Sequence, residues 1–194
     1  SKSDGNRLDV NNIYTFNRLG LNNALEGGTS LTVGNDFSIF DYNKSREIFS
    51  LKLANNLRLE ENHDLPKANQ LGGKNSNFFG ELKYSPNEIL TTQYNASAKN
   101  NLTDINYENF IAEISLNNFV TSFDYLNENN FTNRSSYLTN SVKYKVNEFN
   151  NISFSTRENK SSNLTEYYNL IYEYKNDCLA ASIEYNKDYY DDRD

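Results

Sequence analysis

Apolar and polar residues alternate with a period of two over most of this sequence. In YLTNSVKYKV, residues 137–146, the apolar side chains are separated by Thr, Ser and Lys. Successive side chains of a strand point to opposite faces, whereas residues two apart on a helix lie on different sides of it. The alternation therefore predicts strands that have one apolar and one polar face.

About ten such stretches follow one another, and they predict an all-β antiparallel fold. The expected strands are 28–40, 46–60, 77–85, 88–98, 107–117, 119–128, 135–146, 149–158, 164–175 and 178–190. Short turns are expected at 41–45, 86–87, 117–118, 147–148 and 176–177, and longer polar loops at 61–76, 99–106, 129–134 and 159–163. The hairpins recur at a regular spacing from Pro86 onward, as a repeat of architecture without a repeat of sequence.

Alternating short and long connections are typical of transmembrane β-barrels, whose turns on one side are short and whose loops on the other are long. Strands that cross a bilayer need about 9–11 tilted residues, and the expected strands are long enough. The apolar face would then meet lipid, and the polar face would line a wet interior. Tyrosines near strand ends would form the interfacial girdles: Tyr84, Tyr125, Tyr144, Tyr174 and Tyr185. A soluble β-sandwich or solenoid with one apolar core is the alternative that this pattern leaves open.

Composition excludes several other classes of protein. The mean hydropathy of -0.82 is that of a polar chain, but 14% of the residues are aromatic, which disordered chains rarely are. A net charge of -7 disfavours a broad nucleic-acid-binding surface. No apolar run is long enough for a membrane-spanning helix.

No catalytic, metal-binding or cofactor-binding constellation stands out, and we do not expect an enzyme. His63 is the single histidine and lies in a polar loop, where a solvated side chain is the simplest interpretation. The cations on the polar faces are candidates for contacts with phosphate, although a generic hydrated lining is the simpler explanation for each. They are Lys52, Arg58, Lys83, Lys143, Lys145 and Arg157.

Two patches resemble the LptD family of lipopolysaccharide-assembly outer-membrane proteins, in particular its alphaproteobacterial members. Near the C-terminus the stretch YEYKNDCLAASIEYNKDYYDDRD matches the family at Asp177, Cys178, Asp192, Arg193 and Asp194. Near the N-terminus the matching residues are Asn17, Arg18, Glu26, Gly27 and Gly28. Asn23 and Ala24 depart from the pattern, since the family has Asp-Arg there, and this weakens any role tied to that pair.

The resemblance implies that the whole chain is part of an outer-membrane β-barrel domain, with 1–27 as a lead-in segment and 28–190 as about ten meandering strands. A fragment of a larger barrel is expected to form a closed barrel by itself or an open curved sheet with free edges at 28–40 and 178–190. The family receives lipopolysaccharide from a periplasmic transport bridge, and a lipoprotein of the LptE type plugs its barrel. A porin-like or adhesin-like small outer-membrane barrel is the alternative function.

Cys178 is the only cysteine, so an internal disulfide is excluded. A small buried residue at the start of a strand is one interpretation, and a disulfide to something outside this chain is another. The resemblance implies the second: in the family, cysteines at this position pair with the periplasmic domain. The bacterial periplasm is oxidising enough to allow such a bond.

Overall fold

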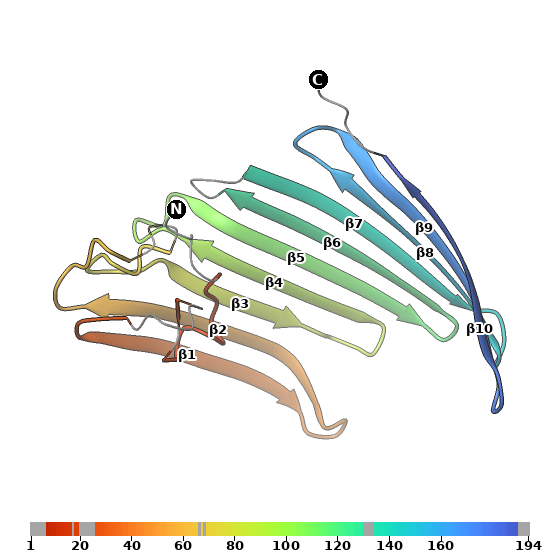
Figure 1. Ribbon diagram of the computed structural model, residues 1–194. Helices are drawn as coiled ribbons and strands as arrows, with labels where there is room; N and C mark the ends of the chain where they lie inside the picture. The colour runs from red at the N-terminus through yellow and green to blue at the C-terminus, as the bar shows by residue number, and fades with distance from the viewer. Residues whose placement is uncertain are drawn as a thin grey trace. The chain divides into compact units, whose positions relative to one another are not determined.

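The computed structural model describes residues 7–16, 18, 19, 26–65, 67, 69–129 and 134–189. Ten strands follow the chain order in one antiparallel sheet, β1-β2-β3-β4-β5-β6-β7-β8-β9-β10 (Figure 1). The strands are β1 (Ser30–Asp41), β2 (Arg46–Arg58), β3 (Phe78–Tyr84), β4 (Leu90–Ala98), β5 (Ile105–Leu116), β6 (Phe119–Asn129), β7 (Arg134–Lys145), β8 (Asn150–Asn159), β9 (Leu164–Lys175) and β10 (Ala180–Asp188). The part of the chain that is described contains no helix long and apolar enough to cross a membrane.

The all-β prediction is confirmed, and every expected strand is present with ends within two residues of the expected ones. The expected difference in connection length is clear only for the 59–77 loop. The connections at 160–163 and 176–179 are equally long, because β8 takes up Asn159 from the expected loop and β10 begins at Ala180, two residues later than expected.

Both ends of the strand order are open. Among the described residues, β1 pairs with β2 alone and β10 pairs with β9 alone, so the sheet is not closed. This confirms the expected free edges. A β-sandwich needs two sheets, whereas the described strands form one.

The chain divides into two compact units. Unit 1 comprises Ser1–Tyr84, Gln93–Asn109 and Glu128–Asn133, and unit 2 comprises Ser85–Thr92, Phe110–Asn127 and Arg134–Asp194. Unit 1 thus holds β1–β3 entire, and unit 2 holds β7–β10 entire.

The strand register gives unit 2 an apolar face and a polar face. Phe154 lies opposite Val142 on one side and Leu170 on the other, while its neighbour Ser155 lies opposite Ser141 and Asn169. The apolar face carries Val142, Tyr144, Ile152, Phe154, Tyr168, Leu170, Tyr172, Ile183 and Tyr185. The polar face carries Lys143, Lys145, Ser153, Ser155, Arg157, Asn169, Glu173, Ser182 and Glu184.

Unit 1 has the same two faces, and its pattern of burial is the reverse of that in a soluble sheet. Leu53 and Leu57 on the apolar face of β2 are 48% and 42% exposed, whereas Asn56 on the polar face is 1% exposed. Soluble proteins bury the apolar face of a sheet and hydrate the polar one. Here the polar face is the covered one.

Two chain segments cover the polar face of unit 1. We call residues 7–16, 18 and 19 the docked segment, and residues 59–65, 67 and 69–77 the covering loop. They supply most of the buried apolar cluster, which they complete with Ala54 of β2 and Phe79 of β3. The other members are Leu8, Val10, Ile13, Leu19, Leu65 and Leu71. The N-terminal segment is therefore packed onto the sheet, which the sequence pattern did not indicate.

Three turns of unit 2 share one hydrogen-bonding pattern. The side-chain Oδ1 of Asn87, Asn147 and Asn176 accepts hydrogen bonds of 2.8–3.0 Å from the backbone N–H groups two and three residues later. Asn favours such turns because its side chain imitates a backbone carbonyl. The three sequences, NEIL, NEFN and NDCL, share Asn followed by an acidic residue. The turns thus carry a short sequence repeat, contrary to the expectation of none.

Candidate functional surfaces on the two faces of the sheet

The apolar face of β7–β10 has an uncharged central zone. At its described positions 136–144, 150–156, 168–174 and 181–185, the side chains on this face include no Asp, Glu, Lys, Arg or His. Charged residues on this face lie near the strand ends, at Arg134, Glu158 and Lys187. The zone is well exposed; Phe154 is 41% and Ile183 73% accessible.

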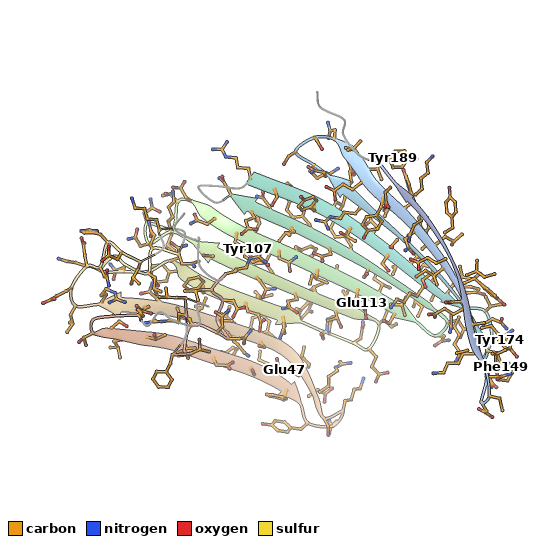
Figure 2. The ribbon with its side chains drawn as sticks, viewed as in Figure 1. Glu47, Tyr107, Glu113, Phe149, Tyr174 and Tyr189 are labelled. Carbon is orange, nitrogen blue, oxygen red and sulfur yellow. The ribbon has the colours of Figure 1, made fainter. Side chains whose placement is uncertain are left out.

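Aromatic rings flank this zone at both ends of the strands. At the turn between β7 and β8, the rings of Phe149 and Tyr174 lie 6.5 Å apart, and Figure 2 labels both. At the other end, the Tyr168 ring lies 6.4 Å from Phe154 and 5.8 Å from Tyr189. Aromatic rings near both ends of the strands lie where the interfacial girdles were expected.

The tyrosines named from the sequence fall into two groups. Tyr84 is the last residue of β3, and Tyr144 and Tyr174 are the next-to-last residues of β7 and β9. These three lie at strand ends, as expected. Tyr125 and Tyr185 lie inside β6 and β10 instead, because each strand continues beyond its tyrosine.

The polar face of unit 2 presents two lysines with no ion-pair partner in the described part of the chain. Lys143 and Lys145 are exposed and lie opposite Ser153 and Asn151, which carry no charge. The third cation expected on this face, Arg157, is engaged. Its Nε lies 3.1 Å from Glu166, and its guanidinium lies 3.9 Å from the centre of the Tyr137 ring.

In unit 1 the two lysines expected on the polar face share one buried carboxylate. The Nζ atoms of Lys83 and Lys52 lie 3.1 and 3.9 Å from Oε1 of Glu81, whose side chain is 4% exposed. Gln93 donates a 3.1 Å hydrogen bond to the other oxygen of that carboxylate. Both lysines therefore lie where the sequence placed them, but they neutralise a protein carboxylate.

A buried ion-pair cluster joins the N-terminal motif residues to the sheet. Glu26 accepts hydrogen bonds of 2.8 and 2.6 Å from Nε and Nη2 of Arg18, and a further bond from Nη2 of Arg58. The side chains of Glu26 and Arg58 are 7% and 1% exposed. Two arginines around one carboxylate leave this cluster with a net positive charge, which the surrounding acceptors help to offset.

Arg58 is fully engaged by this cluster. Besides Glu26, it donates hydrogen bonds to the carbonyl oxygens of Gly27, at 2.6 Å, and Leu71, at 3.2 Å. The sequence had placed Arg58 among the possible phosphate contacts. Its burial corrects that expectation, because its guanidinium has no face left for a solute in this conformation.

Gly28 has a backbone reason to be glycine. Its φ is 88°, and a Cβ at this position would lie 2.8 Å from Nη1 of Arg58. The matching Gly27 supplies the carbonyl that Arg58 binds. Four of the five N-terminal motif residues are therefore described, and all four surround the cluster. Asn17, Asp192, Arg193 and Asp194 lie outside the described residues.

Cys178 lies in the β9–β10 turn, exposed and free, and the chain forms no disulfide of its own. Its backbone N–H donates to Asn176, at the position that Ile89 and Phe149 occupy in the related turns. The interpretation of Cys178 as a small buried residue is therefore wrong. The turn holds its backbone and leaves the thiol to solvent.

The covering loop contains a pocket of about 420 Å³, and His63 is among its lining residues. Nε2 of His63 lies 3.9 Å from Glu61, and the His63 side chain is 88% exposed. No group of three or more His, Cys, Asp or Glu side chains that could hold a metal ion occurs among the described residues.

No family model matches this sequence, and no curated protein matches it. The resemblance to the LptD family therefore rests on the quoted motif residues. Six of these, at positions 18, 26, 27, 28, 177 and 178, are described by the structure.

Replacing Glu26 by Gln should destabilise unit 1 strongly, because it leaves two buried guanidinium groups without a counter-charge. Breaking a buried ion pair costs about 3–5 kcal/mol, so the midpoint of urea unfolding should fall clearly. Asp104→Asn is the matched control, since its pair with Lys99 at 2.8 Å is half-exposed and is worth about 0–1 kcal/mol. Equal midpoints for the two variants would contradict a structural role for the cluster.

Proposed function

We propose that this chain forms part of the wall of an outer-membrane β-barrel that transports and assembles lipopolysaccharide. The observation that carries the proposal is the uncharged, exposed apolar face of β7–β10 with aromatic rings at both ends. A transmembrane barrel turns such a face to lipid and a polar face to its lumen. The bilayer would be that of the bacterial outer membrane.

The energetics of the apolar face favour this placement. Moving one large aliphatic or aromatic side chain out of water stabilises a protein by about 1.5–3 kcal/mol. Monomeric soluble proteins rarely expose contiguous apolar patches larger than a few hundred Å². Phe154, Leu170, Tyr172 and Ile183 are each at least 40% exposed and gather on one face. Lipid tails would cover them without a second protein layer.

Lipopolysaccharide is the proposed cargo because the motif residues of both patches resemble the LptD family. Its sugars and phosphates would pass along the polar face, where hydroxyls, amides and the exposed Lys143 and Lys145 are available. The proposed partners are a periplasmic transport bridge and a lipoprotein of the LptE type. The chain's role would be in transport and assembly and not in catalysis. Nucleic acid is not a proposed partner.

Cys178 would attach this wall to another domain of the longer protein that the resemblance implies. The exposed thiol lies in the turn between β9 and β10. In the family that the motif residues resemble, cysteines at this position pair with the periplasmic domain, so this turn would face the periplasm. A disulfide to a cysteine outside this sequence would hold a periplasmic domain under the barrel.

Membrane insertion is tested by placing one charge on either face of β8. Phe154→Arg should block insertion, because Arg at the bilayer midplane costs about 2–4 kcal/mol on the lipid face of a barrel. Ser155→Arg is the neighbouring control on the polar face and should insert normally. Recovery in outer-membrane fractions and the heat-induced shift of the folded band on gels measure both. Equal insertion of the two variants would overturn the lipid-facing assignment.

Lipopolysaccharide contact is tested on the two free lysines. The double variant Lys143→Glu/Lys145→Glu should weaken binding of purified lipopolysaccharide, with each lost charged contact contributing about tenfold. Lys160→Glu is the control, since Lys160 lies in a loop and pairs with Glu158 at 2.9 Å. Binding unchanged in the double variant would remove these lysines from the path.

The disulfide is tested on non-reducing gels of the full-length protein. Cys178→Ser should change the mobility of the oxidised protein and leave that of the reduced protein unchanged. Identical mobilities of the oxidised native and variant proteins would refute the bond.

A further inference from the structure

The largest departure from a simple barrel wall is the apolar cluster on the polar face of unit 1. Leu8, Val10 and Ile13 of the docked segment are buried there with Leu65 and Leu71 of the covering loop. In a barrel the polar face lines the lumen, so this cluster would lie inside the lumen. We propose that the docked segment and the covering loop form a built-in plug that closes the lumen along unit 1 to polar solutes. This inference rests on the membrane placement proposed above.

The docked segment is fixed to the sheet at β1. The hydroxyl of Tyr14 approaches Gly34 so closely that a Cβ there would lie 1.6 Å from the Tyr14 oxygen and 2.9 Å from the carbonyl oxygen of Leu53. Glycine at position 34 therefore makes room for Tyr14. A strand glycine often marks the close approach of another group.

The same segment reaches the strands at the other side of unit 1. Arg7 donates a 2.8 Å hydrogen bond to Glu128 of β6, and its guanidinium lies 4.2 Å from the centre of the Tyr107 ring of β5. Tyr107 is labelled in Figure 2. With Tyr14 at β1 and Arg7 at β5 and β6, the docked segment crosses the polar face of unit 1 from one side to the other.

The covering loop is folded into a fixed structure of its own. The Asn62 N–H donates to the carbonyl of Gly72 at 2.8 Å, and a Cβ on Gly72 would come within 2.2 Å of the Asn62 carbonyl oxygen. Two amides attach its end to the sheet: the half-buried Asn55 donates to the Ser76 carbonyl at 3.0 Å, and the buried Asn77 donates to Ser97 at 3.1 Å. A loop held by buried hydrogen bonds does not open freely, because each broken bond leaves an unsatisfied group.

The ion-pair cluster links the two parts of the plug. Arg18 belongs to the docked segment, and Arg58, at the end of β2, binds the Leu71 carbonyl of the covering loop. Both guanidinium groups bind Glu26.

The plug also limits where the proposed lipoprotein partner could bind. The polar face of unit 1 is already occupied by the chain itself, so such a partner would have to bind other parts of the barrel lining.

The plug is tested by detaching the docked segment without altering a strand. Ile13 is 0% exposed, so Ile13→Asp places a charge in the apolar cluster and should release the segment. Phe16→Asp is the matched control in the same segment, because Phe16 is 98% exposed. Full-length protein in liposomes should admit a tetrasaccharide several-fold faster with Ile13→Asp, measured by swelling, and at the native rate with Phe16→Asp. Native permeability in a folded Ile13→Asp protein would overturn the plug.

A second measurement decides the matter if Ile13→Asp does not fold. A cysteine is introduced at position 13 or at position 16 of the Cys178→Ser protein. The rate at which a maleimide polymer labels each variant is measured, and the rate for the Cys178→Ser parent is subtracted. Residue 13 should react more than about tenfold more slowly than residue 16, because labelling there requires local opening. If the two variants show the heat-induced gel shift and are labelled at equal rates, the plug is refuted and the membrane placement is not. If the native protein shows no heat-induced shift, the membrane placement itself is refuted.

Discussion

The hydrogen-bonded ladder between neighbouring strands is the interaction on which the rest of this structure depends. In most soluble β-proteins an apolar core would share that role, but here large side chains on the apolar face of each unit, such as Leu53 and Phe154, are more than 40% exposed. The eight buried apolar side chains found among the described residues form one cluster, and that cluster lies on the polar face of unit 1. Backbone pairing satisfies β2–β9 on both sides and leaves one open edge on each of β1 and β10. Such pairing is what a chain in hydrocarbon requires, because unpaired N–H and C=O groups are costly there.

The polar face uses its charges mainly within the protein. Glu81 holds two lysines, Glu26 holds two arginines and Glu166 holds Arg157. The six cations named from the sequence as possible phosphate contacts thus separate into four that are paired and two lysines that have no ion-pair partner among the described residues. The free pair, Lys143 and Lys145, lies in unit 2, whereas the polar face of unit 1 is covered. We therefore expect solute contact on the unit 2 strands and closure on the unit 1 strands.

The turns show how a compositional bias acquires a structural role. Asn is abundant throughout the chain, and an AT-rich genome would be a sufficient explanation. Three of these residues, Asn87, Asn147 and Asn176, nevertheless form the same turn through the same pair of backbone contacts. Asn followed by an acidic residue at three of the five expected short turns was the signal available in the sequence. In the β9–β10 turn, the Asn176 side chain fixes the backbone of Cys178, and the thiol stays exposed.

The sequence alone determined the positions of the strands, their order along the chain and the composition of each face. Alternation is a local property, so each strand shows it without reference to the rest of the fold. The tertiary structure decided which charges are free and what covers the polar face. Arg58 meets Glu26 across 32 positions, and Arg7 meets Glu128 across 121. Such partners depend on how the chain returns to the sheet, and no periodicity records that. The docked segment has no alternation of its own, so only its burial against Ala54 and Phe79 shows that it belongs to the fold.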